Sequence, residues 1–346
     1  MIFLGGIKMS KITIPEGYKA RLSLIETEVA IKLIKDTFER RLAEQLRLTR
    51  VSAPLFLLKN TGLNDNLSGK EKPVSFTSFE LNHDDEIEII HSLAKWKRDA
   101  LHRYNFEIHT GLYTDMNAIR KDEELDNIHS MYVDQWDWEM VIRKEDRTME
   151  YLMATVNKIY RALLDVEFQM IRHYPQLGES ILPDDIYFIT TQELEDLYPD
   201  MTPKQRERQI TKAKKAVCLL QIGDILASGS KHDGRAPDYD DWKLNADILL
   251  YNPQLDDALE ISSMGIRVDE TVLKSQLEKA NAQERLELPY HKNVINNVLP
   301  LSVGGGIGQS RLCMFFLRKA HIGEVQASLW DEDTMRQCEE HDIKLL

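Results

Sequence analysis

The pattern of apolar and polar positions predicts a chain in which long helices and long strands are mixed. From residue 22 onward, apolar side chains recur at every fourth position with charged residues between them. These apolar residues are Ile34, Phe38, Leu42 and Leu46. Such spacing predicts an amphipathic helix. The stretch 48–58 follows directly and is rich in β-branched and apolar residues, so it favours a strand, in which Pro54 indicates an interruption or a sheet edge.

Further along the chain, strands and helices follow one another without strict alternation. The expected segments are a strand turning into a helix over 84–101, a strand over 111–120, a polar loop over 121–127, a returning strand over 128–142, helices over 148–173, 202–216 and 270–287, strands over 246–251 and 258–268, and a glycine-rich strand leading to a helix over 299–320. The helix at 202–216 has a favourable N-terminus, with Thr202 as N-cap and Pro203 at the first helical position. This mixture predicts an α+β fold, with a largely antiparallel sheet flanked by helices.

The composition narrows the class of protein. The chain has 346 residues, of which 42% are hydrophobic, enough for a substantial core. We expect residues 1–20, which lack periodicity, to form a loose tail and residues 21–346 to form a single domain. The net charge of −13 makes nucleic acid a poor default partner.

The cysteines and the apolar runs favour a cytoplasmic protein. Cys218, Cys313 and Cys338 form no CxxC pair, so neither a zinc site nor a disulfide framework is indicated. No run approaches the roughly 18 apolar residues of a membrane span. The apolar start is too short for a signal peptide. We therefore expect a soluble protein in the cytoplasm, without membrane contact.

The glycine-rich segment 304–317 looks like a phosphate loop but fits neither common type. No Gly-Lys-Ser/Thr follows as in a Walker A motif, and the third glycine of a dinucleotide fingerprint would fall at Gln309. A glycine at every second position, from 304 to 308, strips one face of a strand of side chains, so a flat purine could lie there. Arg311 could stack on such a ring or reach a phosphate. The alternative is close packing of the strand against the following helix.

The returning strand carries polar residues where a sheet is usually apolar. Val133, Gln135 and Asp137 share one face by the period of two. Burying a Gln and an Asp side by side is unfavourable unless they bind something, and they suit an ammonium group. A solvent-facing edge strand is the alternative, although Trp136 and Trp138 on the other face argue against it.

The segment HDGRAPDYDDW, residues 232–242, crowds His, Arg and several carboxylates around a Gly and a Pro. A solvated surface loop has this composition. The rim of a site that holds a cationic group and a metal-bound phosphate has it as well. Spacing alone leaves both interpretations open.

Three segments together resemble the signature motifs of the class II aminoacyl-tRNA synthetase catalytic fold. They are the helix and strand with Pro54, the strand–loop–strand that opens at Arg120, and the glycine strand that leads to Arg311. Longer strings resemble a family within that superfamily more closely, the ammonia-dependent asparagine synthetases, or aspartate–ammonia ligases. These strings are DNLSG (65–69), HSLAKWKR (91–98), YVDQWDWE (132–139), HDGRAPDYDDW (232–242), ISSMGIRV (261–268) and GGGIGQSR (304–311).

The resemblance runs from about residue 20 to the C-terminus, with two departures. Only KLN, residues 243–245, follows DYDDW, where the family usually has a longer segment. The stretch 221–234 is also slightly altered around its glycines. The shortened segment puts in doubt how the site closes over its substrate.

The resemblance implies a reaction. Aspartate, ATP and ammonia would give asparagine, AMP and pyrophosphate through a β-aspartyl adenylate. The alternative is an aspartate-activating tRNA-synthetase paralogue without ammonia ligase activity. A true tRNA synthetase would need a tRNA-reading domain, for which we expect residues 1–20 to be too short. A glutamine-dependent enzyme would need an N-terminal catalytic Cys, and the first cysteine is Cys218. The superfamily also implies a homodimer, formed through the first helix and the Pro54 strand.

The resemblance also assigns roles to residues. The catalytic candidates are Arg120 at the α-phosphate, Asp240 near the reacting carbonyl and Arg311 over the adenine. Mg²⁺, an oxygen-seeking ion, would be held by Asp247 and Glu260 on adjacent strands. Further ATP contacts are Ser262 and Gly306. The aspartate would be held through its α-ammonium by Asp65, Gln135 and Asp137, through its α-carboxylate by Lys97 with Ser92, and by Ser263. For Lys97, the alternative is a solvated lysine on a helix.

Overall fold

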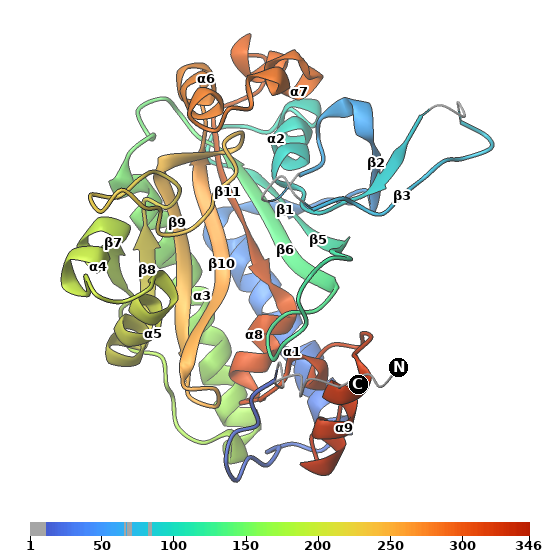
Figure 1. Cartoon of the computed structure of the whole chain (residues 1–346), viewed down its shortest axis with the longest axis vertical. Helices are drawn as coiled ribbons and strands as arrows, with labels where there is room; N and C mark the ends of the chain where they lie inside the picture. The colour runs from blue at the N-terminus through green and yellow to red at the C-terminus, as the bar shows by residue number, and fades with distance from the viewer. Residues whose placement is uncertain (1–11, 66, 68–70, 82–84) are drawn as a thin grey trace, which may run out of the picture.

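The computed structural model describes residues 12–65, 67, 71–81 and 85–346. Among them, eight strands form one sheet (Figure 1). In spatial order these strands are β1 (Leu48–Arg50), β5 (Gly111–Ile119), β6 (Tyr132–Val141), β11 (Ser302–Gly308), β10 (Asp257–Arg267), β9 (Asp240–Asn252), β8 (Ala216–Leu220) and β7 (Tyr187–Thr190). Within this sheet, only the outer pairs, β1 with β5 and β7 with β8, are parallel. The expected α+β fold with a largely antiparallel sheet is confirmed.

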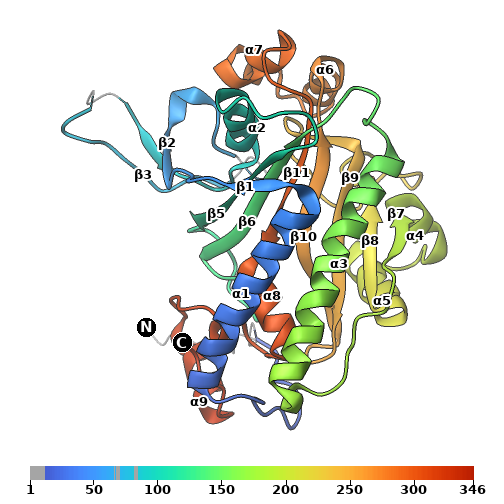
Figure 2. The ribbon, with the colours of Figure 1, turned by 180° about the vertical axis from the view of Figure 1, so that it is seen from behind.

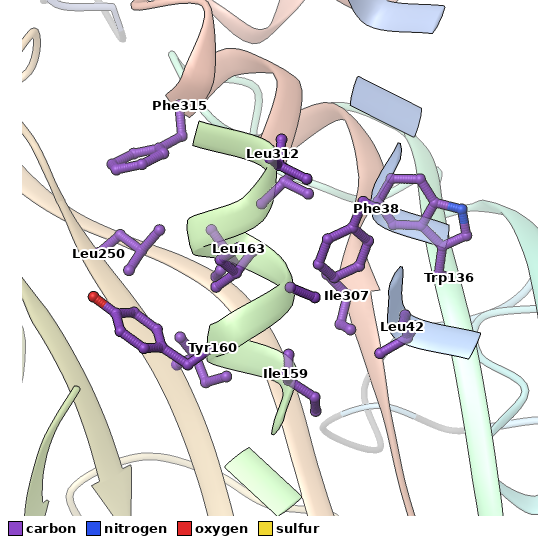
Figure 3. Packing of buried hydrophobic residues seen from close by; sticks show 14 of the residues in the cluster. Phe38, Leu42, Trp136, Ile159, Tyr160, Leu163, Leu250, Ile307, Leu312 and Phe315 are labelled. Atoms are coloured by element: carbon purple, nitrogen blue, oxygen red, sulfur yellow. The ribbon is translucent and has the colours of Figure 1, made fainter. Parts of the chain in front are cut away.

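Three helices cover one face of the sheet, as Figure 2 shows. They are α1 (Leu24–Leu46), α3 (Met149–His173) and α8 (Gln309–Phe316). The apolar stripe expected on the first helix is buried, and its Phe38 ring lies 4.9 Å from the ring of Trp136. Figure 3 shows this core, in which Leu163 of α3 and Ile307 of β11 complete the layer between helices and sheet. The large core fixes the strands whose other face carries the site.

The remaining helices lie around the sheet. The helices α2 (Ala94–Arg103), α6 (Glu270–Lys279) and α7 (Pro289–Ile295) gather at its upper end in Figure 1, with α4 (Thr191–Leu197) and α5 (Pro203–Lys214) beside β7 and β8 and α9 (Glu332–Glu340) at the lower end. A small sheet of β2 (Phe56–Leu58), β4 (Ile87–Ile89) and β3 (Ser75–Phe76) projects to the side. Short 3-10 turns are Lys59–Thr61, Pro175–Leu177, Gln283–Glu287 and Ile322–Glu324. No helix in the described part of the chain is long and apolar enough to cross a membrane.

Several sequence predictions agree with the structure in detail. Thr202 caps α5, where its side chain accepts a hydrogen bond from the backbone N–H of Gln205. The helix expected over 148–173 is α3, capped by Thr148. The strand around Pro54 is interrupted, as one of the two interpretations required, because β1 and β2 belong to different sheets.

Other predictions were wrong. The single helix expected over 270–287 is α6 followed by the 3-10 turn Gln283–Glu287, because α6 ends at Lys279 and Asn281 adopts a positive φ of 51°. The strands β7 and β8 were not anticipated. The loose tail lies partly outside the described residues, at 1–11. Its described part packs against the body, since Ile12 is buried and the Tyr18 hydroxyl donates to Glu324.

Candidate functional site

A cavity of about 360 Å³ opens over β6, β11 and β10, on the face of the sheet opposite to α1 and α3. Because these strands are central, the rigid core behind them fixes the side chains on their open face. The cavity brings together seven of the residues proposed from the sequence. They are Arg120, Gln135, Glu260, Ser262, Ser263, Gly306 and Arg311. Asp65, Ser92, Lys97, Asp137, Asp240 and Asp247 are not among its lining residues.

Strand β6 supplies polar groups to the open face of the sheet. Trp136 and Trp138 are fully buried in the core on the opposite face, so Gln135 and Asp137 face the site side. β6 pairs with β5 on one side and with β11 on the other. The alternative of a solvent-facing edge strand is therefore wrong.

The glycines of β11 make room for side chains from β6. A Cβ on Gly306 would lie 2.5 Å from Gln135 Oε1 and 2.9 Å from Asp137 Oδ1, both too close. A Cβ on Gly304 would collide with the Glu139 carboxylate. The bare face expected for a flat ligand is thus occupied at these two positions. A Cβ on Gly308, which lines the cavity, would lie 3.3 Å from the Cβ of Arg311, so the Arg311 side chain covers the strand at that position.

Lys97 and Asp137 form a buried ion pair beneath the cavity. Lys97 Nζ lies 2.8 Å from Asp137 Oδ2 and donates to the carbonyl oxygen of Gly305 at 2.7 Å. The Lys97 side chain is only 1% exposed, which rules out a solvated helix lysine. Burial lowers its pKa, while the Asp137 charge opposes that shift. Asp137 Oδ1 is buried and has no hydrogen-bond partner among the described residues.

Ser92 and Asp65 do not line the cavity and make local hydrogen bonds to the backbone. Ser92 Oγ accepts a hydrogen bond from the backbone N–H of Ala94 at the start of α2. Asp65 Oδ1 accepts one from the backbone N–H of Leu67. Asp65 is 4% exposed. The other residues of the string DNLSG, 66 and 68–70, lie outside the described residues.

The segment 232–242 is not a solvated loop. Its carboxylates Asp238, Asp240 and Asp241 are buried, and Asp238 is 0% exposed. Three cationic or polar groups from other elements surround Asp238 Oδ2: Lys95 Nζ at 3.4 Å, Arg285 Nη1 at 3.1 Å and His291 Nε2 at 3.0 Å. These partners outweigh the effect of burial and hold the pKa of Asp238 well below its usual range. The contacts of Asp238 with Lys95 and His291 therefore join the segment to α2 and α7.

Arg235, which sequence reasoning did not single out, lies at the centre of that segment. It lines the cavity, and its Nη2 donates to Asp247 Oδ1 at 2.7 Å. Its Nη1 donates to Ser263 Oγ, and its Nε lies 3.7 Å from Asp240 Oδ2. The sequence could have indicated this role, because Arg235 is the one arginine among the carboxylates of the segment 232–242. Its guanidinium places a fixed positive charge at the cavity wall.

Arg267, Glu139 and Asp240 form a buried ionic triad next to Arg235. Arg267 pairs with Glu139 at 2.7 Å and also with Asp240 Oδ1. Ser302 Oγ donates to Glu139 Oε1 at 2.7 Å. Asp240 Oδ2 makes no hydrogen bond to the described residues. The triad was missed because its members come from three strands that are far apart in the sequence.

Asp247 and Glu260 stand on adjacent strands, as expected, and Glu260 pairs in register with Leu249 two residues from Asp247. Burial raises the pKa of Asp247 to about 7; the Arg235 charge counteracts this shift, and the Glu260 charge adds to it. No group of three or more His, Cys, Asp or Glu in the described part of the chain could hold a metal alone. Two carboxylates nevertheless suit Mg²⁺ when substrate phosphates complete the coordination.

Arg120 and Arg311 approach the cavity from different sides. Arg120 Nη2 contacts the carbonyl oxygen of His91 at 3.5 Å, and its buried Nε has no partner among the described residues. Arg311 Nη1 donates to the carbonyl oxygen of Glu260 at 2.9 Å. The two guanidinium groups and Arg235 give the cavity three cations, an arrangement suited to a phosphate chain.

Comparisons with known proteins point in one direction. A family model for aspartate–ammonia ligases matches residues 25–342. The aspartate–ammonia ligase of Clostridium tetani is 60% identical over 336 residues, covering 97% of this chain and 98% of that protein. The corresponding protein of Lactiplantibacillus plantarum is 59% identical over 319 residues, covering 92% and 98%.

Among solved structures, tRNA synthetases share the fold. An asparaginyl-tRNA synthetase of Entamoeba histolytica, in complex with asparaginyl-adenylate, has a TM-score of 0.60 at 11% identity, covering 88% of this chain and 66% of that protein. The asparaginyl-tRNA synthetase of Pyrococcus horikoshii has a TM-score of 0.57 at 14% identity, covering 88% and 70%. At such identities the likeness shows the fold alone, which is the class II synthetase catalytic fold expected from the sequence.

Proposed function

Because this chain belongs to the aspartate–ammonia ligase family, we propose that its site makes asparagine from aspartate, ammonia and ATP, releasing AMP and pyrophosphate. One observation carries the proposal most strongly. The buried Lys97–Asp137 pair lies beneath a cavity that is lined by three arginines and by Glu260, and Asp247, the other candidate metal ligand, pairs with the cavity residue Arg235. A zwitterionic amino acid matches the first feature and a metal-bound polyphosphate matches the second.

In the first half-reaction, the β-carboxylate of aspartate attacks the α-phosphorus of ATP and pyrophosphate leaves. The substrate's α-ammonium would meet Asp137 and Gln135, and its α-carboxylate would meet Lys97. Arg120 would stabilise the charge that develops on the α-phosphate. Arg311, which lines the cavity beside Gly308, would lie over the adenine. Ser262, Ser263 and Gly306 line the same cavity and would add contacts.

Mg²⁺ is part of this proposal. Asp247 and Glu260 would hold it together with phosphate oxygens, and it would neutralise charge on the phosphates. Asp247 must then exchange its present contact with Arg235 for the ion. Arg235 would in that case be free to turn toward an anionic group of the substrate.

In the second half-reaction, ammonia attacks the activated β-carbonyl and expels AMP. Ammonium has to lose a proton before it can attack, and a carboxylate nearby could attract the cation and accept that proton. Asp240 is our candidate. Its Oδ1 is held by Arg267, whereas its Oδ2 makes no hydrogen bond to the described residues. Asp65 and Ser92 remain candidates for substrate contact by resemblance, although neither lines the cavity in this structure.

We also propose a homodimer and a cytoplasmic location. The superfamily resemblance favours a homodimer formed through the first helix and the Pro54 strand, and α1 exposes the apolar side chains of Ile25 and Val29. A cytoplasmic location fits the three unpaired, buried cysteines. Nothing in the comparisons favours a tRNA-synthetase paralogue without ligase activity.

Product analysis tests the proposal. The protein is incubated with ATP, Mg²⁺ and aspartate, with ammonium, with glutamine or with neither, and AMP, pyrophosphate and asparagine are measured. We expect asparagine with equal amounts of AMP and pyrophosphate when ammonium is present, and none with glutamine alone. ADP in place of AMP would contradict the adenylate route. Exchange of pyrophosphate into ATP without asparagine formation would support the paralogue instead.

A further inference from the structure

A second cavity lies between the N-terminal segment, the start of α1 and the C-terminal residues. Its volume is about 480 Å³, and it shares no lining residue with the cavity of the proposed active site. Figure 2 shows the first turns of α1 beside α9 at the lower end of the molecule, away from α2, α6 and α7. The activity proposed above uses none of the residues that line this second cavity.

Positive charge dominates the wall of the second cavity. Lys19, Arg21, Lys319 and Lys344 line it, whereas Asp342 is the one acidic residue among the described residues of its lining. The Asp342 carboxylate lies 2.7 Å from Lys344 Nζ, and both side chains are exposed. Exposed pairs of this kind are weak and exchange partners easily. The cavity therefore carries a surplus of cations in a protein whose overall charge is −13.

Lys319 is the most unusual of these cations. It is only 3% exposed, and its nearest carboxylate, Glu324, lies 4.0 Å away, beyond hydrogen-bond distance. Both oxygens of Glu324 already accept from the Tyr18 hydroxyl, at 2.6 and 2.8 Å. No hydrogen bond joins the Lys319 ammonium to any residue that the structure describes. A buried ammonium that faces a cavity without a close partner is suited to an anion from solution.

The start of α1 adds donors to the same cavity. Thr27 lines it, is 1% exposed, and its Oγ1 has no hydrogen-bond partner among the described residues. Ser23 caps the helix and satisfies the N–H of Glu26. The first N–H groups of any helix lack intrahelical acceptors and favour anions. The unpartnered Thr27 hydroxyl and the buried Lys319 thus stand beside the positive end of a long helix.

We propose that this cavity is a binding site for a compact anion of the phosphate class. Lys319 and the start of α1 would bind the anion, and the positive charges of Lys19 and Lys344 would attract it. The surplus of charge favours a multiply charged oxyanion over a singly charged carboxylate. Inorganic phosphate, pyrophosphate and the phosphate group of a metabolite share this chemistry. The proposal does not depend on the activity of the other cavity.

Calorimetric titration of the full chain tests the proposal, with inorganic phosphate in one series and pyrophosphate in another, and without ATP or Mg²⁺. The variants are Lys319→Met, Lys344→Gln and, as a control in the other cavity, Arg311→Ala. We expect Arg311→Ala to keep one binding event of unchanged affinity. Lys319→Met should weaken that event about 10- to 150-fold, since a hydrogen bond to a charged group is lost. Lys344→Gln should weaken it by a smaller factor.

Three results would overturn the proposal. They are the absence of binding at millimolar concentrations of both anions, equal affinity in the wild type and Lys319→Met, and loss of all binding in Arg311→Ala. Should Lys319→Met fail to fold, the double variant Lys19→Gln/Lys344→Gln decides, because both side chains are exposed. Unchanged affinity in that double variant would then reject the site. A tighter response to pyrophosphate than to phosphate would indicate a polyphosphate ligand.

Discussion

Lys97 Nζ and Asp137 Oδ2 lie 2.8 Å apart, and both side chains are almost completely buried. In the unliganded protein the two groups neutralise each other. A zwitterionic substrate would offer each of them an opposite charge, and Asp137 Oδ1 has no hydrogen-bond partner within the described part of the chain. Under the proposed function, the same two groups would bind the α-carboxylate and the α-ammonium of aspartate.

Asp137→Asn should weaken the use of aspartate. The variant removes a charged acceptor, worth about 1.5–3 kcal/mol, so kcat/KM for aspartate should fall roughly 10- to 150-fold. Steady-state kinetics with aspartate as the varied substrate measure the change. Asp165→Asn, which alters an exposed carboxylate on α3, is the matched control and should stay near the wild-type value. An unchanged kcat/KM in Asp137→Asn would place Asp137 outside the site.

Arg311→Ala should impair the use of ATP more than the binding of aspartate. The side chain lies beside Gly308 in the wall of the cavity, and its Nη1 donates to the carbonyl oxygen of Glu260. We expect kcat/KM for ATP to fall about 10- to 150-fold. Arg311→Lys should restore little, because an ammonium cannot stack as a planar guanidinium does. Intact ATP affinity by calorimetry in Arg311→Ala would contradict this role.

Gly306→Ala should disturb aspartate binding through geometry alone. The added Cβ would meet Gln135 Oε1 and Asp137 Oδ1, so at least one of these groups must move. We expect a loss of about tenfold or more in kcat/KM for aspartate. Gly234→Ala is the control within the same cavity, because a Cβ there meets no atom within 4 Å. Equal effects of the two variants would refute the proposed crowding.

Arg267→Met should reduce stability, because it leaves Glu139 and Asp240 buried without their common cation. Breaking such a buried pair lowers the free energy of unfolding by about 3–5 kcal/mol. Urea denaturation measures this difference. Arg336→Met, in an exposed helix pair on α9, should leave the denaturation midpoint unchanged. A neutral result for Arg267→Met would mean that the triad is dispensable for folding.

Glu324→Gln should change how stability depends on pH. Burial raises the pKa of Glu324 to about 7, against the charge of Lys319 and the hydrogen bond from Tyr18. The folded state therefore resists ionisation of Glu324, so its contribution to stability is greatest at low pH. That contribution declines from the unfolded pKa near 4.5 up to about 7. The variant should lose this decline, and parallel curves of unfolding free energy against pH would exclude the shift.

Much of the fold could be predicted from the chain because its periodic segments are long. The apolar stripe of α1, the Thr202 cap and the alternation along β6 are local signals, and each is present in the structure. The strands β7 and β8 were not predicted, because short buried strands show no alternation of apolar and polar residues. The end of the helix near Asn281 was not predicted either, because the pattern of charged residues continues past it.

The site could be predicted only in part. Resemblance located Arg120, Gln135, Glu260 and Arg311, and all four line one cavity. The contacts that hold the wall in place did not follow from the sequence. The contacts of Asp238 and the triad at Arg267 join residues from separate strands and helices, and only the three-dimensional register brings them together.

Isotope transfer tests the central claim most directly. Aspartate labelled with ¹⁸O in its β-carboxylate is incubated with ATP, Mg²⁺ and ammonium, and the products are analysed by mass spectrometry. An adenylate intermediate requires that one labelled oxygen remain on phosphorus when ammonia expels AMP. We predict ¹⁸O in AMP and none in pyrophosphate. Label in inorganic phosphate, or asparagine formed with unlabelled AMP, would contradict the β-aspartyl adenylate.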